Sequence, residues 1–121
     1  MIYRRPAERQ ANPEKVVLEN KCLTQVPLLE GEEALKHLAL ANNQIRKIDH
    51  LVSLPNLQTL DLSGNKLTEI NNFWLPGSNL DKLRFLILAR NQIRQIRNLE
   101  KLSGLERLDL SDNRVVELSG L

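Results

Sequence analysis

The chain has 121 residues, a length that suits a single domain. Its 17 Lys and Arg residues against 15 Asp and Glu residues leave a formal net charge of +2, too balanced for the electrostatic footprint of a typical nucleic-acid-binding protein. The single cysteine, Cys22, excludes an internal disulfide and a zinc site with several cysteine ligands, and it favours a reducing compartment. No signal-peptide pattern opens the chain and no run of about 18 apolar residues occurs, so we expect a cytoplasmic protein that does not enter a membrane.

In chain order, the first expected segment is a polar, proline-bearing arm over residues 1–15, which we predict to pack over the first strand. Residues 16–34 contain a weak copy of the repeat described next, VVLENKCLTQV, with Lys21 where the other copies have an asparagine. We interpret this segment as an N-terminal capping repeat. Residues 35–121 are predicted to form four repeats, the last one truncated, as expected for a fragment of a longer array.

Four segments share the pattern L-x-x-L-x-L-x-x-N-x-[ILV]-x-x-[IL], and they begin at Leu35, Leu57, Leu83 and Leu105. The first and third intervals between these leucines are equal, and the second is longer by four positions. The pattern asparagines keep the same intervals: Asn43, Asn65, Asn91 and Asn113. Four matches in one register are typical of a repeat protein, in which each unit buries its apolar side chains against its neighbours.

The pattern predicts the fold from simple geometry. In L-x-L, both leucines point to one side of a short strand, and strands that recur in one direction form a parallel sheet. After the strand the chain must turn, and an asparagine amide can both donate to and accept from the backbone groups of that turn. Leucines three apart in the return segments, such as Leu51 with Leu54, indicate short helical turns. We therefore expect an α/β solenoid, curved, with a parallel sheet on its concave face and short helical or 3-10 turns on its convex face.

These residues resemble the leucine-rich-repeat family, in particular its 22-residue class with an N-x-I-x-x-I turn and a second L-x-x-L. That class includes the regulatory subunit of type-1 protein phosphatase, the leucine-rich light chain of axonemal dynein, and several centrosomal and ciliary proteins. The entry segment RPAERQANPEKVVLENKCLTQVPLLEGEEAL is similar to the entry of the leucine-rich-repeat subunit of the tubulin polyglutamylase complex. The insertion WLPGSN between Phe73 and Leu80 departs from the family's regular pattern.

We find no pattern that predicts catalysis, a metal site or a cofactor. Asp61 and Asp109 occupy the same outward slot of strands two steps apart, about 9.6 Å by sheet spacing, near the wide end for inverting glycosidases. They would lie on an open sheet face without a pocket, so solvated surface acids are the simpler interpretation. His37 and His50 lack further ligands at metal-like spacing, and Cys22 is interpreted as an exposed thiol near the cap. We therefore expect neither an enzyme nor a small-molecule substrate.

The strand residues that point away from the core form the candidate binding surface. Phe85 and Ile87 project from one strand, and an apolar pair surrounded by polar residues is typical of an interaction hot spot. The alternative is that aromatic and β-branched residues simply suit strands. The predicted partner-binding residues are His37, Asp61, Phe85, Ile87, Arg107 and Asp109.

The resemblance implies a protein-binding scaffold within a larger intracellular cytoskeletal, centrosomal or ciliary protein. Two alternatives stay open: a regulatory or targeting module for type-1 protein phosphatase, and, less favoured by the charge balance, an RNA-associated adaptor. We also expect the last coil, whose outer side is uncovered where the chain stops at Leu121, to self-associate or to fray.

Two further surfaces carry open interpretations. The third repeat is basic, which indicates either a solvated, charge-balanced surface or a patch for an acidic partner; its residues are Arg84, Arg90, Arg94, Arg97 and Lys101. Trp74 and Leu75, in the insertion, form a second exposed apolar contact or fold back on the convex side.

Overall fold

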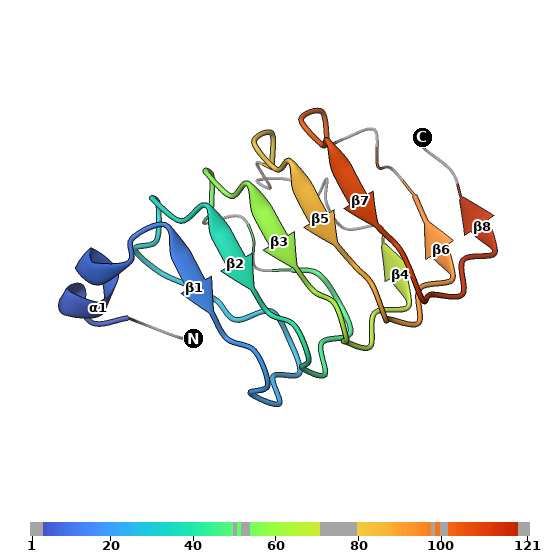
Figure 1. The fold of residues 1–121 in the computed structure, drawn as a ribbon, viewed down its shortest axis with the longest axis horizontal. Helices are drawn as coiled ribbons and strands as arrows, with labels where there is room; N and C mark the ends of the chain where they lie inside the picture. Colours follow the sequence, from blue (N-terminus) through green and yellow to red (C-terminus); the bar gives the residue numbers. More distant parts are fainter. Residues whose placement is uncertain are drawn as a thin grey trace.

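The computed structural model describes residues 4–49, 51, 54–70, 80–97, 99 and 102–118, and over these residues the chain winds as a solenoid of stacked coils (Figure 1). A short helix, α1 (Pro6–Ala11), precedes the first coil. Successive coils contribute one strand each to a five-stranded parallel sheet, in the order β1 (Lys15–Val17), β2 (His37–Ala39), β3 (Thr59–Asp61), β5 (Phe85–Ile87) and β7 (Arg107–Asp109). The predicted parallel-sheet solenoid is confirmed.

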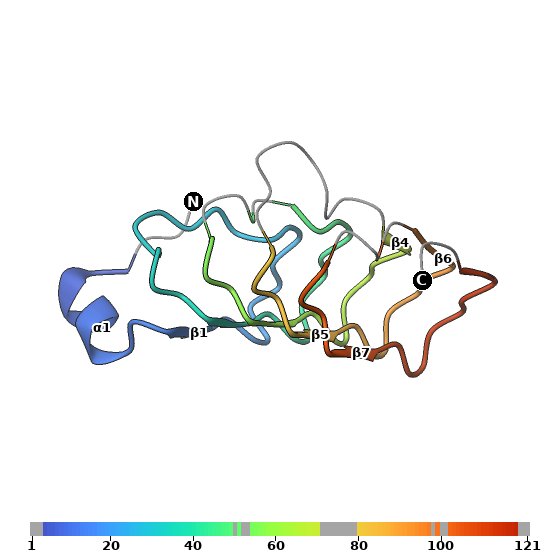
Figure 2. The ribbon, with the colours of Figure 1, turned by 90° about the horizontal axis from the view of Figure 1, so that it is seen from above.

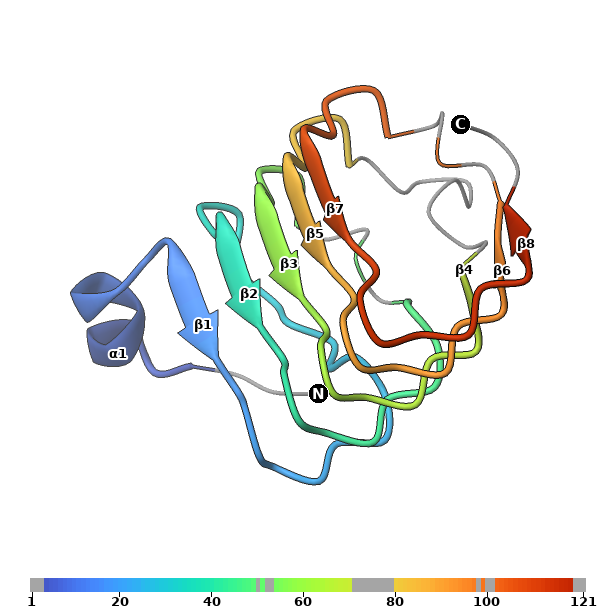
Figure 3. The same ribbon diagram turned by 45° about the vertical axis from the view of Figure 1, so that its right-hand side comes forward.

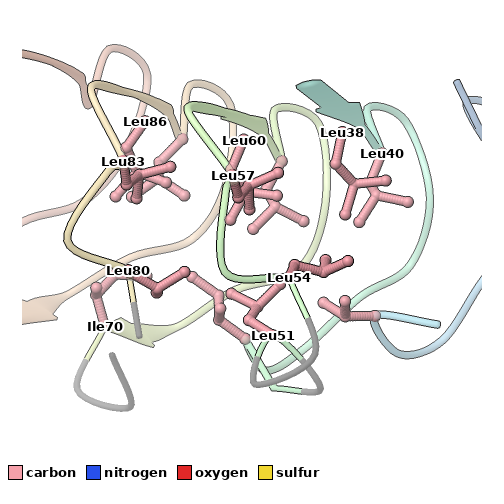
Figure 4. Packing of buried hydrophobic residues seen from close by; sticks show 14 of the residues in the cluster. Leu38, Leu40, Leu51, Leu54, Leu57, Leu60, Ile70, Leu80, Leu83 and Leu86 are labelled. Atoms are coloured by element: carbon pink, nitrogen blue, oxygen red, sulfur yellow. The ribbon is translucent and has the colours of Figure 1, made fainter. Parts of the chain in front are cut away.

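The register of this main sheet follows the repeat pattern position by position. Leu60 pairs with Leu38 on one side and with Leu86 on the other, and Leu86 pairs in turn with Leu108. Leucines of consecutive coils therefore stack inside the solenoid (Figure 4). Leu60 and Leu86 are completely buried. Because burying one such side chain stabilises a fold by roughly 1.5–3 kcal/mol, this stack is the main stabilising feature of the solenoid.

A second, smaller parallel sheet lies across the core from the main one (Figure 3), and its strands are β4 (Glu69–Ile70), β6 (Gln95–Ile96) and β8 (Glu117–Leu118). Sequence analysis did not predict these two-residue strands. They pair because Ile70 and Ile96, the last apolar positions of the repeat pattern, stack in register between coils.

The predicted short helical turns are present in the return segments as single hydrogen-bonded turns. The Leu54 N–H donates to the Leu51 carbonyl at 3.1 Å, and the Leu102 N–H donates to the Leu99 carbonyl at 2.9 Å. Figure 2 shows strands β1, β5 and β7 of the main sheet along one side of the solenoid and β4 and β6 on the opposite side. Leu51, Leu54, Leu99 and Leu102 are all buried, so the second leucine pair of each repeat fills the core, as its spacing predicts.

In the turn after each main-sheet strand, the residue at one particular position of the repeat adopts a left-handed backbone conformation, which Cys22 of the first coil shares at another position. The φ angles lie between 56° and 67°, and the residues occupy equivalent positions of the repeat: Asn20, Asn42, Gly64, Arg90 and Asp112. Glycine, asparagine and aspartate tolerate this conformation, whereas a long side chain is strained in it. Arg90 is therefore the one residue at this repeat position whose side chain is poorly suited to the left-handed conformation.

The first coil is completed by a buried ion pair that the sequence analysis missed. Glu32 stands one regular repeat before Leu54, in the column of the second leucine, and is only 2% exposed. Arg4 donates two hydrogen bonds of 2.7 Å to its carboxylate, and Arg9 lies 3.6 Å from it. Helix α1 buries none of its own side chains, and the arm is attached to the coil by these arginines together with the Glu14 carbonyl, which accepts from the Lys36 and His37 N–H groups at 2.8 Å. The signal in the sequence was an acid at a leucine position.

Candidate protein-binding surface

The four pattern asparagines link each coil to the one before it. The Asn65 amide donates to the carbonyl of Leu62 in its own coil at 2.9 Å and to that of Leu40 in the preceding coil at 3.0 Å, while its oxygen accepts from the Ile45 N–H at 3.0 Å. Asn91 makes the same set of bonds one coil later. Each asparagine therefore makes the predicted contacts within its own turn. Its amide also bonds the preceding coil, and this bridge keeps consecutive strands in register.

Asn43 and Asn113 complete this ladder of amides. Asn43 bridges back to the first coil, where the backbone N–H groups of Lys21 and Leu23 donate to its oxygen at 2.9 and 3.0 Å. Asn113 accepts from the Ile93 N–H at 3.0 Å and donates to the Leu88 carbonyl at 2.8 Å. Asn43, Asn65 and Asn91 are buried, whereas Asn113 is half-buried in the outermost coil that the structure describes.

The side of the main sheet that points away from the core, here called the open face, aligns outward side chains in rows across the strands. The phenylalanine row consists of Lys15, His37, Thr59, Phe85 and Arg107. The aspartate row consists of Val17, Ala39, Asp61, Ile87 and Asp109. All six residues predicted to bind a partner therefore lie in these two rows, on one continuous face.

A third row follows the aspartate row toward the strand ends and carries mostly small side chains: Glu19, Ala41, Ser63, Ala89 and Ser111. Backbone bonds align it, because Asn42 N–H donates to the Ser63 carbonyl and Gly64 N–H to the Ala89 carbonyl, each at 2.9 Å. Ala41 and Ser63 are buried, so this small row forms a low floor beside the taller aspartate row.

Asp61 and Asp109 each engage the small row directly. The Ser63 N–H and hydroxyl donate to one Asp61 oxygen at 3.0 and 2.8 Å, and Ser111 makes the same two bonds to Asp109 at 3.0 and 2.7 Å. The backbone N–H and hydroxyl of Ser111 hold the pKa of the Asp109 carboxyl below its usual range. The D-x-S spacing could have predicted that each serine bonds the aspartate two positions before it, but the sequence analysis did not assign this contact.

Phe85 is held in place from one side. The Arg84 guanidinium carbon lies 5.3 Å from the centre of the Phe85 ring, and Arg84 also bonds Glu106 at 2.7 Å. Phe85 and Ile87 are both half-buried rather than fully exposed. The most exposed large apolar residue of the open face is Val17, at 51%, which stood in the outward slot of the weak first repeat but was left out of the predicted site.

Other candidate residues fall outside this face. Cys22 is exposed, in agreement with its interpretation as a surface thiol. His50, Trp74, Leu75 and Lys101 lie outside the described residues. Arg94, of the basic third repeat, lies apart from Arg84, because it borders an open groove of about 420 Å³ beside the second sheet, lined also by Thr68, Glu69, Gln95 and Val116.

Within the described ranges, no helix is long and apolar enough to cross a bilayer. Over the same part of the chain, no three His, Cys, Asp or Glu side chains are placed so that they could share a metal ion.

Comparison with known proteins gives matches along the repeat region. A family model described as "Leucine rich repeat" matches residues 55–115, which is 61 of the 121 residues, and a second, described as "Leucine Rich repeats (2 copies)", matches residues 33–73. The chain is also similar to the human protein "Leucine-rich repeat-containing protein 49", with 33% identity over 71 residues. That match covers 59% of this chain and 10% of the relative, so the chain spans only a small part of that protein's length.

Proposed function

Because the chain belongs to the leucine-rich-repeat family, whose domains generally mediate protein–protein interaction, we propose that it is a protein-binding module that takes its partner on the open face of the main sheet. The observation that supports this assignment is the alignment of Asp61, Ile87 and Asp109 in one row beside Phe85. A half-buried aromatic and aliphatic pair flanked by charged groups has the composition of a binding hot spot.

The rigidity of this face also supports the proposal. The asparagine ladder fixes neighbouring strands in register, and the serine bonds fix the orientation of both aspartates. A partner that binds a preformed surface loses less conformational entropy than one that must order it. The cellular setting that we propose is a larger cytoskeletal, centrosomal or ciliary protein, which rests on the resemblance of the repeat class.

The alternative is a targeting module for type-1 protein phosphatase, and the acidic and aromatic residues Asp61, Phe85 and Asp109 favour it within this family. Both versions use the same face. The two hypotheses predict different partner proteins bound to this chain, so one affinity purification distinguishes them.

The experiment compares tagged wild-type chain with the double variant Phe85→Ala/Ile87→Arg in quantitative affinity purification from cells. The matched control is Val115→Ala/Val116→Arg, since these valines are exposed and lie outside the open face. We expect the first variant to lose specific partners at least tenfold while it keeps the wild-type melting temperature, because truncating a hot-spot residue removes about 2 kcal/mol or more of binding energy. Equal recovery of all partners by both variants would contradict the proposal.

A further inference from the structure

Over three neighbouring strands, the aspartate row alternates between charged and apolar side chains. Asp61 pairs with Ile87, and Ile87 pairs with Asp109, on three neighbouring strands. Neighbouring strands lie about 4.8 Å apart, so the two aspartates are separated by about 9.6 Å with the isoleucine midway between them. The row continues through Ala39 to the exposed Val17 with the same spacing.

Both carboxylates keep acceptor capacity for a partner. Each receives its two serine bonds on a single oxygen, Oδ1, and a carboxylate offers about four lone-pair positions on its two oxygens. The serine bonds fix the side-chain orientation without using this whole capacity. A basic side chain that approaches the row therefore meets two anionic groups that are already oriented.

The spacing of the row fits a helix better than an extended peptide. Residues i and i+7 of an α-helix lie on one face about 10.5 Å apart along the axis, with i+3 and i+4 between them. An extended strand repeats one face every two residues, about 6.6 Å, so its next matching positions lie about 6.6 and about 13 Å away. Only the helical repeat places two side chains about as far apart as Asp61 and Asp109, with a third side chain midway.

We propose, building on the function proposed above, that the partner presents an amphipathic helix that lies across the strands, with basic side chains seven positions apart on Asp61 and Asp109 and an apolar side chain between them on Ile87. The next turns of the helix place further apolar side chains over Ala39 and Val17. The low floor of the small row leaves room for the helix body, and Phe85, supported by Arg84, forms the opposite wall.

The two aspartates are not equivalent in this arrangement. Arg107 is exposed on the same strand as Asp109, and its charge acts on that carboxylate. A basic side chain of the partner that approaches Asp109 is therefore also repelled by Arg107. We expect the contact at Asp61 to contribute more to affinity than the contact at Asp109.

The test uses the full chain and a display library of helical peptides randomised along one face. Each peptide has about five helical turns, so that it is longer than the row that it must cross. Binders are selected on the wild-type chain, with removal of peptides that also bind the Phe85→Ala/Ile87→Arg variant. We expect enrichment of Lys or Arg at i and i+7 with an apolar residue at i+3 or i+4. Binding of the enriched peptides is then measured by fluorescence anisotropy.

Asp61→Lys should weaken binding of the enriched peptides about tenfold or more, and a peptide with Glu in place of the matching basic residue should bind this variant better than it binds wild type. Asp81→Lys, at an exposed acid outside the row, is the matched control and should leave affinity unchanged. Enriched peptides without the seven-residue spacing, or without loss on Asp61→Lys, would overturn the helix proposal. If the purification variant still loses its native partners in that case, the proposed binding face stands and only the helix is wrong.

Discussion

The Arg4 guanidinium donates two hydrogen bonds of 2.7 Å to the carboxylate of Glu32, across 28 positions of sequence. The Glu32 side chain is 1% exposed and that of Arg4 is 13% exposed, so most of this pair is withdrawn from water. The Glu32 carboxylate raises the pKa of Arg4, which stays charged. A buried carboxylate in a leucine column is stable only while its cationic partner is present.

Arg4→Ala should therefore destabilise the chain by about 3 kcal/mol, because it leaves Glu32 buried with only the longer Arg9 contact. The variant Arg4→Met/Arg9→Met/Glu32→Leu, which restores the leucine column, should be close to wild type in stability. Urea unfolding measures both changes. Arg5→Ala, at an exposed arginine of the same arm, serves as the control. Equal unfolding midpoints for Arg4→Ala and wild type would show that the ion pair does not hold the arm.

Asn65→Leu should destabilise the chain by about 2 kcal/mol or more, because it leaves buried backbone groups of two coils without their partner. Asn113→Leu should cost less, since Asn113 is half-buried and water can replace the lost bonds. Asn56→Leu is the control outside the ladder, where the amide makes exposed contacts only. Thermal melts compare the three variants. A common melting temperature would contradict the assigned role of the ladder.

Arg90→Asn should stabilise the chain by about 1 kcal/mol, because asparagine is less strained than arginine in a left-handed conformation. Arg90 has φ 56°, and Asn42 already occupies the equivalent position of an earlier repeat. Arg94→Asn, at an exposed position of the same repeat outside the left-handed column, controls for the loss of a positive charge. Denaturant unfolding should give a higher midpoint for Arg90→Asn alone; a lower midpoint would mean that the arginine side chain stabilises the turn by contacts that outweigh this strain.

The carboxyl of Asp109 should titrate below its ordinary value of 3.8, because the Ser111 N–H and hydroxyl donate to it. Since the folded pKa is lower than the unfolded one, this group stabilises the fold at pH values above the unfolded pKa. The contribution is lost as the pH falls through the folded pKa. Ser111→Ala removes the hydroxyl and should move the pKa upward, toward 3.8. Ser103→Ala, at an exposed serine that does not bond this carboxylate, should not change the pKa; NMR titration of the Asp109 carboxyl carbon distinguishes these results.

The main sheet was predictable because its cause is local and repeated. Each L-x-L determines which residues point inward, and the constant interval from L-x-L to the asparagine determines the register, so the sequence alone predicts that Leu38, Leu60 and Leu86 stack. The same alternation placed Phe85 and Ile87 on the outward side. Their role as binding residues stays a prediction, since placement on a face says nothing about what covers it.

The features that sequence analysis missed depend on contacts between residues far apart in the chain, or on local conformational preferences that differ by small free energies. In the sequence, Glu32 is notable only as an acidic residue at a position where the other repeats have leucine. Its partner Arg4 lies in an arm that has no periodic pattern, so the pairing could not be predicted. The second sheet rests on strands of two residues, which are too short for an alternation pattern to indicate. The left-handed column could have been inferred from Asn42, Gly64 and Asp112, but Arg90 at the same position obscures it.

The interval between Leu57 and Leu83 is longer by four positions than its neighbours, yet Asp61 still pairs with Ile87 and Thr59 with Phe85. The extra length falls between Ile70 and Leu80 and does not shift any row of the open face. The order of the side chains on the open face is therefore independent of the number of residues between Ile70 and Leu80. A peptide tag or reporter inserted between Ile70 and Leu80 would accordingly leave the arrangement of the displayed rows intact.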